Sequence, residues 1–247
     1  MRFFIKVSSK SFAMSSKHLQ SGDARPVFDN AKKFRIYSMK FCPFAQRPRL
    51  VVSAKGLKDF DIVNIKLRDD LPEWYPSINP FRKVPAIEFP DGDAVYGSLV
   101  LCDMLDELYP EKQLHPKDPK EKAKQKLYIE QFGETFIPSI HKHSSQGSEE
   151  TKEEVLKNVG NAEKYLAENK SKYFAGSEAG MLDYMMWPWF ERLPMILTLS
   201  ADVHPNLTNW YNLMQNDPAV KETMISKENY LKFYDGYKKG QVDYDFV

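Results

Sequence analysis

The 247-residue sequence has no excess of charge of either sign, because 35 lysines and arginines face 34 aspartates and glutamates, a formal net charge of +1. A balanced charge provides no overall electrostatic field for binding nucleic acid or an anionic membrane. The chain also has no run of about 18 apolar residues, the minimum for a membrane-spanning helix. We therefore expect no nucleic-acid partner and no stable membrane insertion.

Cysteine is scarce, with only Cys42 and Cys102 in the chain. Two cysteines cannot form a disulfide framework or a thiolate-rich zinc site. The histidines at 115, 141 and 143 are scattered over expected loops and surfaces, so we predict no metal site. Apolar residues make up 42% of the chain, which is enough for a sizeable core. These counts leave room for a single reactive thiol.

Residues 1–33 differ in composition from the rest of the chain. From Met1 to Gly22 there are four lysines and arginines, six serines and no acidic residue. This composition is typical of a mitochondrial transit peptide. A flexible or extended leader, or translation from Met14, also explains it. We favour these explanations because the import pattern is weak and only compositional. We therefore predict a cytoplasmic protein, with mitochondrial import as the alternative, and leave residues 1–33 out of the fold prediction.

Residues 34–110 show the pattern of a small α/β domain. Phe34–Tyr37 and Phe60–Leu67 alternate as strands do, and a helix that starts at Pro43 separates them. Residues 84–89 and 94–96 predict a hairpin around a Pro-Asp-Gly-Asp turn, followed by a helix that Ser98 caps. This order predicts a mixed four-stranded sheet with helices on both faces, which is the thioredoxin-like plan.

The carboxyl half shows no strand pattern. Residues 110–120 contain three prolines and are the expected linker. Residues 120–247 form the expected all-helical domain, because helical spacing recurs at 123–136, 153–168, 181–193 and 207–215. The polar stretch Lys142–Lys152 should be a loop. The aromatic tail 230–247 either frays or folds back over the cleft, and the sequence does not decide between the two.

Cys42 is the candidate nucleophile. It lies where the first strand meets the first helix, next to Pro43 at the first helical position. The free amides and the positive end of the helix dipole at such a junction favour a thiolate, so we predict a lowered thiol pKa. Position 45 is Ala45, so no second cysteine completes a C-x-x-C pair. Mixed-disulfide exchange with an external thiol is then the natural chemistry.

Two further features support a thiol site. Pro85 follows Val84 at the start of a strand, where a proline cannot donate to the ladder. In thioredoxin-like folds this proline is cis and lies beside the thiol, and the residue before it offers its backbone to a peptide-like ligand. Ser98, at the start of a helix, provides a hydroxyl and free amides for a carboxylate. Cys102 lies on the apolar stripe of its helix and is expected to be buried and inert.

Several blocks of the sequence resemble the omega class of cytosolic glutathione transferases. They are residues 36–47 around Phe41-Cys42-Pro43-Phe44, Pro72-Glu73-Trp74, Asn79-Pro80-Phe81, Lys83-Val84-Pro85-Ala86, Leu105–Pro110, and Asp183-Tyr184 through Trp187-Pro188-Trp189-Phe190-Glu191-Arg192-Leu193. The likeness runs from about Phe34 to the end of the chain. It implies a thioredoxin-like domain at 34–110, a helical substrate-binding domain at 120–247, and a homodimer.

The resemblance also implies a function and site residues. Members use glutathione as co-substrate and a cysteine nucleophile, here Cys42, for thiol transfer, dehydroascorbate reduction and reduction of methylated arsenic acids, with weak conjugation of electrophiles. The implied glutathione contacts are Phe44, Lys83, Val84, Pro85 and Ser98. The implied pocket for the second substrate contains Pro43, Trp189 and Arg192, although Trp189 also has the spacing of a core residue.

The sequence departs from the family pattern at three places. Gly97 stands where the family has an acid or glutamine that contacts the amine of glutathione, so one charge-assisted contact is missing. Gly180 replaces the usual serine or threonine that caps a helix, with a small expected loss of stability. Asp69, Asp70 and Leu71 stand where a family lysine precedes Pro-Glu-Trp. These departures put glutathione binding in question and leave the thiol intact.

Two other classes of protein remain possible from the sequence. A non-enzymatic member that binds ligands or partners is compatible with Gly97. The chloride intracellular channel group shares a similar Cys-Pro-Phe block, but it lacks the Trp-Pro-Trp-Phe-Glu-Arg block found here.

Overall fold

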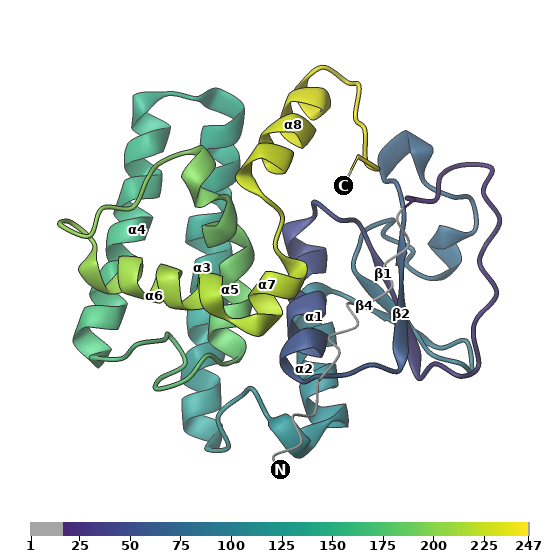
Figure 1. The fold of residues 1–247 in the computed structure, drawn as a ribbon, viewed down its shortest axis with the longest axis horizontal. Helices are drawn as coiled ribbons and strands as arrows, with labels where there is room; N and C mark the ends of the chain where they lie inside the picture. Colours follow the sequence, from purple (N-terminus) through teal and green to yellow (C-terminus); the bar gives the residue numbers. More distant parts are fainter. Residues whose placement is uncertain (1–16, 247) are drawn as a thin grey trace, which may run out of the picture.

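The computed structural model describes residues 17–246 and contains a mixed sheet next to a group of helices (Figure 1). The sheet has the order β2-β1-β3-β4. β1 and β2 are parallel, whereas β3 is antiparallel to both β1 and β4. The bounds are β1 Phe34–Ser38, β2 Phe60–Asn64, β3 Ala86–Glu88 and β4 Ala94–Tyr96. The predicted mixed four-stranded, thioredoxin-like sheet is confirmed.

Helices cover the sheet and form the second half of the molecule. In the first half these are α1 Pro43–Ala54 and α2 Ser98–Leu108. The second half contains α3 Pro119–Gln146, α4 Glu149–Asn169, α5 Met181–Arg192, α6 Pro205–Asn216, α7 Pro218–Thr223 and α8 Lys227–Lys238. α1 contacts both halves, because it packs against α2 on one side and against α5 and α7 on the other. The start of α1 therefore lies where the two halves meet.

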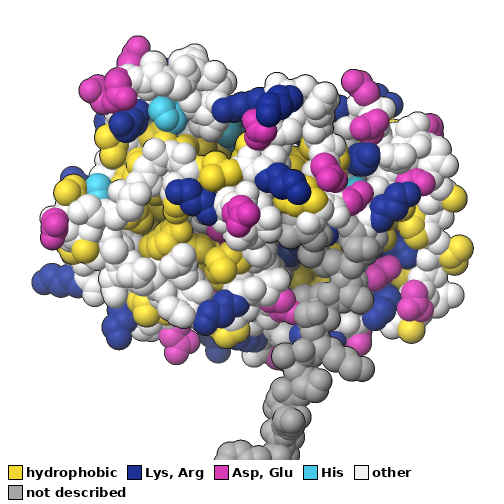
Figure 2. Space-filling view, turned by 45° about the horizontal axis from the view of Figure 1, so that its top comes forward, with side chains coloured by type: hydrophobic (Ala, Val, Ile, Leu, Met, Phe, Trp, Pro, Cys, Tyr) yellow, Lys and Arg dark blue, Asp and Glu magenta, His cyan; other side chains and the backbone are white. Residues whose placement is uncertain are grey.

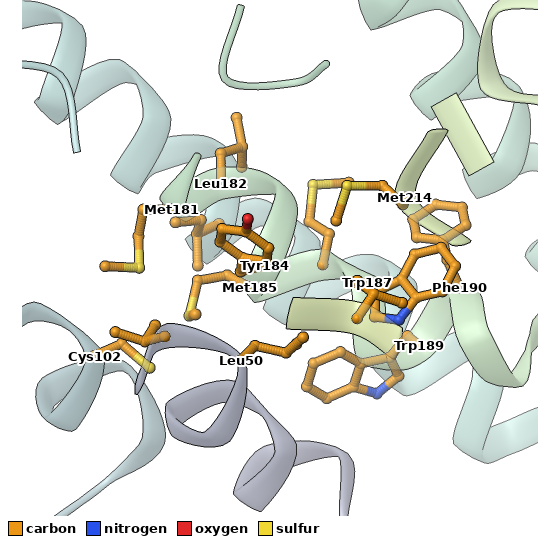
Figure 3. Packing of buried hydrophobic residues seen from close by; sticks show 14 of the residues in the cluster. Leu50, Cys102, Met181, Leu182, Tyr184, Met185, Trp187, Trp189, Phe190 and Met214 are labelled. Carbon is orange, nitrogen blue, oxygen red and sulfur yellow. The ribbon is translucent and has the colours of Figure 1, made fainter. Parts of the chain in front are cut away.

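The core of the helical half is built around α5, whose residues are all buried. In Figure 3, Trp187, Trp189 and Phe190 lie toward one end of this helix, and Met181 and Met185 lie on the side of Cys102. Cys102 is fully buried in this cluster, and burial strongly raises the pKa of its thiol. The structure thus places Cys102 among apolar side chains, as its helical spacing predicts.

The polar stretch Lys142–Lys152 is helical over most of its length, so the predicted loop is wrong. α3 continues to Gln146, Gly147 adopts a left-handed conformation with φ of 65°, and the side chain of Ser148 accepts a hydrogen bond from Thr151 N as the cap of α4. Lys142 and Glu154 form an ion pair of 2.9 Å across the connection. Polar residues can form these helix ends because both ends project into solvent, where a helix needs no apolar face.

Residues 17–33 lie against the sheet, although the composition of residues 1–33 suggests a leader outside the fold. Leu19 forms a parallel bridge with Ile65, and its N–H donates to Asn64 O at 2.9 Å. His18 is buried, and its Nδ1 lies 2.7 Å from Asp245 Oδ1 near the end of the chain. The leader prediction therefore does not hold for residues 17–33. The serine-rich and basic positions that suggest import lie mainly in 1–16, outside the described residues.

The surface agrees with the balanced charge of the sequence. On the face in Figure 2, basic and acidic side chains are interspersed, and neither sign dominates an area. Among the described residues, no helix combines the length and the apolar character needed to cross a membrane.

Candidate active site

A cleft of about 930 Å³ opens where the start of α1 meets the sheet. One wall comes from the loops before β3 and α2, with Lys83, Val84, Pro85 and Ser98. The opposite wall comes from α8 and the tail. Figure 1 shows α8 between the helical half and the sheet, with the tail crossing toward the sheet side. The tail therefore folds back over the cleft, which answers the question that the sequence leaves open.

Cys42 lies at the base of this cleft as the N-cap residue of α1, and its side chain is 9% exposed. Burial raises the pKa of its thiol. The backbone amides of Phe44 and Ala45 and the charges of Arg192 and Arg49 act in the opposite direction but do not prevail. The predicted lowering of the pKa is therefore wrong, because desolvation outweighs these amides and charges.

The structure brings the five predicted glutathione contacts to the same cleft as Cys42. Phe44, Lys83, Val84, Pro85 and Ser98 all line it. The Val84–Pro85 peptide bond is cis. The carbonyl of Lys83 accepts hydrogen bonds from Tyr75 Oη at 2.8 Å and Asn79 Nδ2 at 2.7 Å. These bonds hold the loop that carries Val84, which lines the cleft.

Ser98 is the first residue of α2 and not its cap, which corrects the sequence prediction. Gly97 is the N-cap, with φ of 96° and ψ of 114°. Residues with a Cβ rarely adopt this conformation, so glycine suits the turn from β4 into α2. The first amide of α2 that donates within the helix is that of Leu101, to Gly97 O at 2.9 Å. The amides before it remain available to a ligand at the start of α2.

Of the residues predicted for the second-substrate pocket, only Pro43 lines the cleft. Trp189 is 1% exposed and packs edge-on against Phe44, with ring centroids 5.0 Å apart. Arg192 is 3% exposed; its guanidinium donates to Gln46 Oε1 at 2.9 Å and Phe41 O at 3.0 Å. Both side chains lie behind the cleft, because α5 is buried on every side.

The sequence prediction missed an aromatic wall of the cleft. Phe233, Tyr234 and Tyr237 of α8 and Tyr244 of the tail line it. Their spacing along the helix, i, i+1 and i+4, was the available signal for one aromatic face. Arg68 lies above the ring of Tyr237, 4.6 Å from its centroid, and so connects the sheet side of the cleft to α8. This wall gives the cleft an apolar surface opposite Ser98.

The cleft contains the thiol of Cys42, the loop of Val84 and the start of α2. Within residues 17–246, no three His, Cys, Asp or Glu side chains come together as a metal ion would require. Asp69 is the one carboxylate among the described residues that line the cleft, where Arg68, Arg82 and Lys83 also lie. The arrangement can hold an anionic, peptide-like thiol next to Cys42.

Comparison with known proteins agrees with this arrangement. Family models for "Glutathione S-transferase, N-terminal domain" and "Glutathione S-transferase, C-terminal domain" match residues 41–108 and 102–226. The chain is 38% identical over 230 residues to glutathione S-transferase omega-1 of Rattus norvegicus, which covers 90% of this chain and 93% of the rat protein. It is 39% identical over 227 residues to the omega-1 protein of Sus scrofa, with the same coverage of both chains.

A solved structure of rice GST1 in complex with glutathione has the same fold, with a TM-score of 0.76 at 21% identity, over 85% of this chain and all of that one. The thiol at the start of α1, the cis-proline loop and the sequence relatives lead to one assignment. The chain belongs to the omega class of the glutathione S-transferases.

Proposed function

We propose that the protein is a glutathione-dependent thiol transferase in which Cys42 is the nucleophile. The observation that carries this proposal is a single cleft cysteine with no second thiol in reach. Cys42 lies at the cleft base, and Cys102 is fully buried in the core. A resolving thiol must therefore come from outside the protein, and glutathione is the co-substrate of the family to which the chain belongs.

The reaction takes place in two exchange steps. The Cys42 thiolate attacks the glutathionyl sulfur of a mixed disulfide; the Cys42–glutathione bond forms, the substrate S–S bond breaks, and the released thiolate takes a proton from solvent. The thiolate of a second glutathione then attacks the Cys42–glutathione disulfide. This step releases oxidised glutathione and regenerates the Cys42 thiolate. Because burial raises the pKa of Cys42, the thiolate is the minor form at neutral pH.

In this proposal, different parts of the cleft would hold the different parts of glutathione. The backbone of Val84 beside Pro85 would pair with the cysteinyl unit, as a strand pairs with a neighbour. Ser98 and the free amides of α2 would take the γ-glutamyl carboxylate. Lys83 would pair with the glycyl carboxylate, and Phe44 would pack against the ligand. We further infer that dehydroascorbate and methylated arsenic acids serve as acceptors, for which two glutathiones supply two electrons.

The proposed assembly is a homodimer. Phe81, Tyr96, Leu99 and Val100 are exposed apolar side chains around β4 and the start of α2, with Phe81 66% exposed. The rings of Phe81 and Tyr96 meet edge-to-face with centroids 5.7 Å apart. A cluster of exposed apolar side chains of this kind indicates a protein–protein interface. Light scattering should give twice the monomer mass, and Val100→Glu should shift it toward the monomer.

The deciding experiment compares two cysteine variants. Cys42→Ala should lose reduction of a glutathionylated peptide to the uncatalysed rate, whereas Cys102→Ala should retain it, since Cys102 lies outside the cleft. Full activity of Cys42→Ala would overturn the proposal. Failure of the wild-type protein both to bind glutathione-agarose and to transfer thiols would favour a non-enzymatic binding protein, the alternative that Gly97 supports.

A further inference from the structure

Arg47 of α1 is a buried cation that has no acidic partner within residues 17–246. Its side chain is 3% exposed, and no carboxylate among the described residues pairs with it. Its Nε donates to Met185 O at 2.9 Å, and its Nη1 donates to Ser98 Oγ at 3.2 Å. The guanidinium also lies 4.4 Å from the ring centroid of Trp189. It therefore connects α1 to α5 and to the first residue of α2.

Such a charge is costly to bury. Burial lowers the pKa of Arg47 to about 10, so the side chain remains protonated at neutral pH. The carbonyl of Met185 and the face of Trp189 offset part of the cost, because both present negative potential to the guanidinium. Neither neutralises the charge. The surplus of positive charge is left directly beneath the wall that carries Ser98.

The hydrogen bond from Arg47 restricts what the Ser98 hydroxyl can do. A hydroxyl has one proton to donate and two lone pairs that accept. Since Arg47 can only donate, Oγ must be the acceptor in this bond, and its proton is free for another partner. The first turn of α2 contains no acidic residue that could take that proton or the free amides. A ligand carboxylate at this place would accept from both the hydroxyl and the amides.

We propose that Arg47 is a positioning residue for glutathione, holding Ser98 Oγ from the buried side so that its hydroxyl proton points at the γ-glutamyl carboxylate. The charge of Arg47 adds to the positive end of α2 and strengthens the hold on that carboxylate. This inference rests on the proposed use of glutathione. It assigns part of the binding to a residue that does not touch the ligand.

The position of Arg47 suits this role better than a lysine would. The planar guanidinium reaches Met185 O with Nε and Ser98 Oγ with Nη1 at the same time, which a single ammonium group does not reproduce. Arg47→Lys should therefore keep the charge but lose part of the orientation. Arg47→Met should lose both. The order of affinity for glutathione should be wild type, then Arg47→Lys, then Arg47→Met.

The test measures binding separately from thiol chemistry. In a Cys42→Ser background, calorimetry would follow glutathione and an analogue whose γ-glutamyl carboxylate is an amide. Arg47→Met and Ser98→Ala should each weaken glutathione binding about tenfold or more, and the double variant should be no weaker than the worse single variant. The amide analogue should bind more weakly to Cys42→Ser and be insensitive to both changes.

Activity gives a second readout. With Cys42 present, Arg47→Met should raise KM for glutathione and leave kcat at saturation nearly unchanged. Arg35→Met is the matched control, since Arg35 is equally buried but pairs with Asp61 and does not line the cleft. It should lower the melting temperature without changing the affinity. If Arg47→Met does not fold, Arg47→Lys and Ser98→Ala still carry the test.

Three results would overturn the proposal. They are an unchanged affinity in Arg47→Lys and Arg47→Met, additive losses in the double variant, or equal losses for glutathione and its amide analogue. If the protein transfers thiols but Arg47 variants behave as wild type, the role of Arg47 is refuted and the proposed function stands. Absence of glutathione binding by the Cys42→Ser protein would remove the proposed function as well.

Discussion

Gly180 precedes α5 where the family pattern has a serine or threonine, and restoring the serine should destabilise the protein. The general preference for serine over glycine at an N-cap is worth only a few tenths of a kcal/mol. A Cβ at Gly180 would lie 2.7 Å from the Cβ of Ala175 and 3.0 Å from Leu114 O. Both distances are shorter than ordinary contacts, so a neighbour would have to move.

Neither neighbour is free to move. Leu114 O accepts a hydrogen bond from Met181 N at 2.9 Å, and Ala175 N donates to Asp183 Oδ2 at 3.1 Å. Overpacking in a fixed environment costs about 1–3 kcal/mol. The gain as a cap offsets little of this, so Gly180→Ser should lower the free energy of unfolding by about 1–3 kcal/mol. For a chain of this size that corresponds to roughly 2–12 °C in melting temperature.

Urea unfolding and thermal melting of four proteins check this reasoning: wild type, Gly180→Ser, Ala175→Gly and the double variant. In the Ala175→Gly background the contact at Cβ is absent, so Gly180→Ser should cost clearly less. An unchanged or raised melting temperature in Gly180→Ser would refute the steric argument. An equal cost in both backgrounds would show that Ala175 is not the obstacle.

Three further predictions concern a turn, the two thiols and a buried carboxylate. Gly97→Ala should destabilise the protein by about 1–3 kcal/mol, because φ is 96° at this turn. Gly133→Ala inside α3, where no atom lies within 4 Å of the added Cβ, should stabilise the protein by about 0.5–1 kcal/mol, and equal effects of the two changes in urea unfolding would contradict this. The rate of Cys42 alkylation by iodoacetamide should rise with pH through a midpoint above the usual thiol pKa of ~8.5, because burial raises the pKa and keeps the thiol protonated to higher pH. Cys102 should react only after unfolding. A midpoint below pH 8 for Cys42 would mean that the helix dipole prevails. Asp183 accepts two hydrogen bonds at each carboxylate oxygen, from Phe174 N, Ala175 N, Gly180 N and Trp210 Nε1. Asp183→Asn places an NH₂ group against two of these donors and should lower the free energy of unfolding by about 2–5 kcal/mol, whereas Asp118→Asn at an exposed cap should cost little. A small loss of stability in Asp183→Asn would show that water replaces these bonds.

Local patterns were sufficient for most of the fold and for one wall of the site. Alternation at Phe34–Tyr37 and the Cys42-Pro43 junction predict a strand followed by a helix with the thiol at its start, because these signals depend on a few adjacent residues. Gly97 and Val84-Pro85 likewise mark special backbone positions. The polar helix ends near Lys142 were misjudged, because a helix end that projects into solvent carries no apolar periodicity.

Residue patterns alone were enough to predict the family, the mixed sheet, the helical second half and Cys42 as the candidate nucleophile. Which side chains surround Cys42 became known only from the folded chain. It placed Arg192 and Trp189 behind the cleft, brought the α8 aromatics and the tail in front of it, and set residues 17–33 against the sheet. It also reversed the predicted direction of the Cys42 pKa. A helix start and its dipole are local properties, whereas burial depends on every segment that packs around the residue.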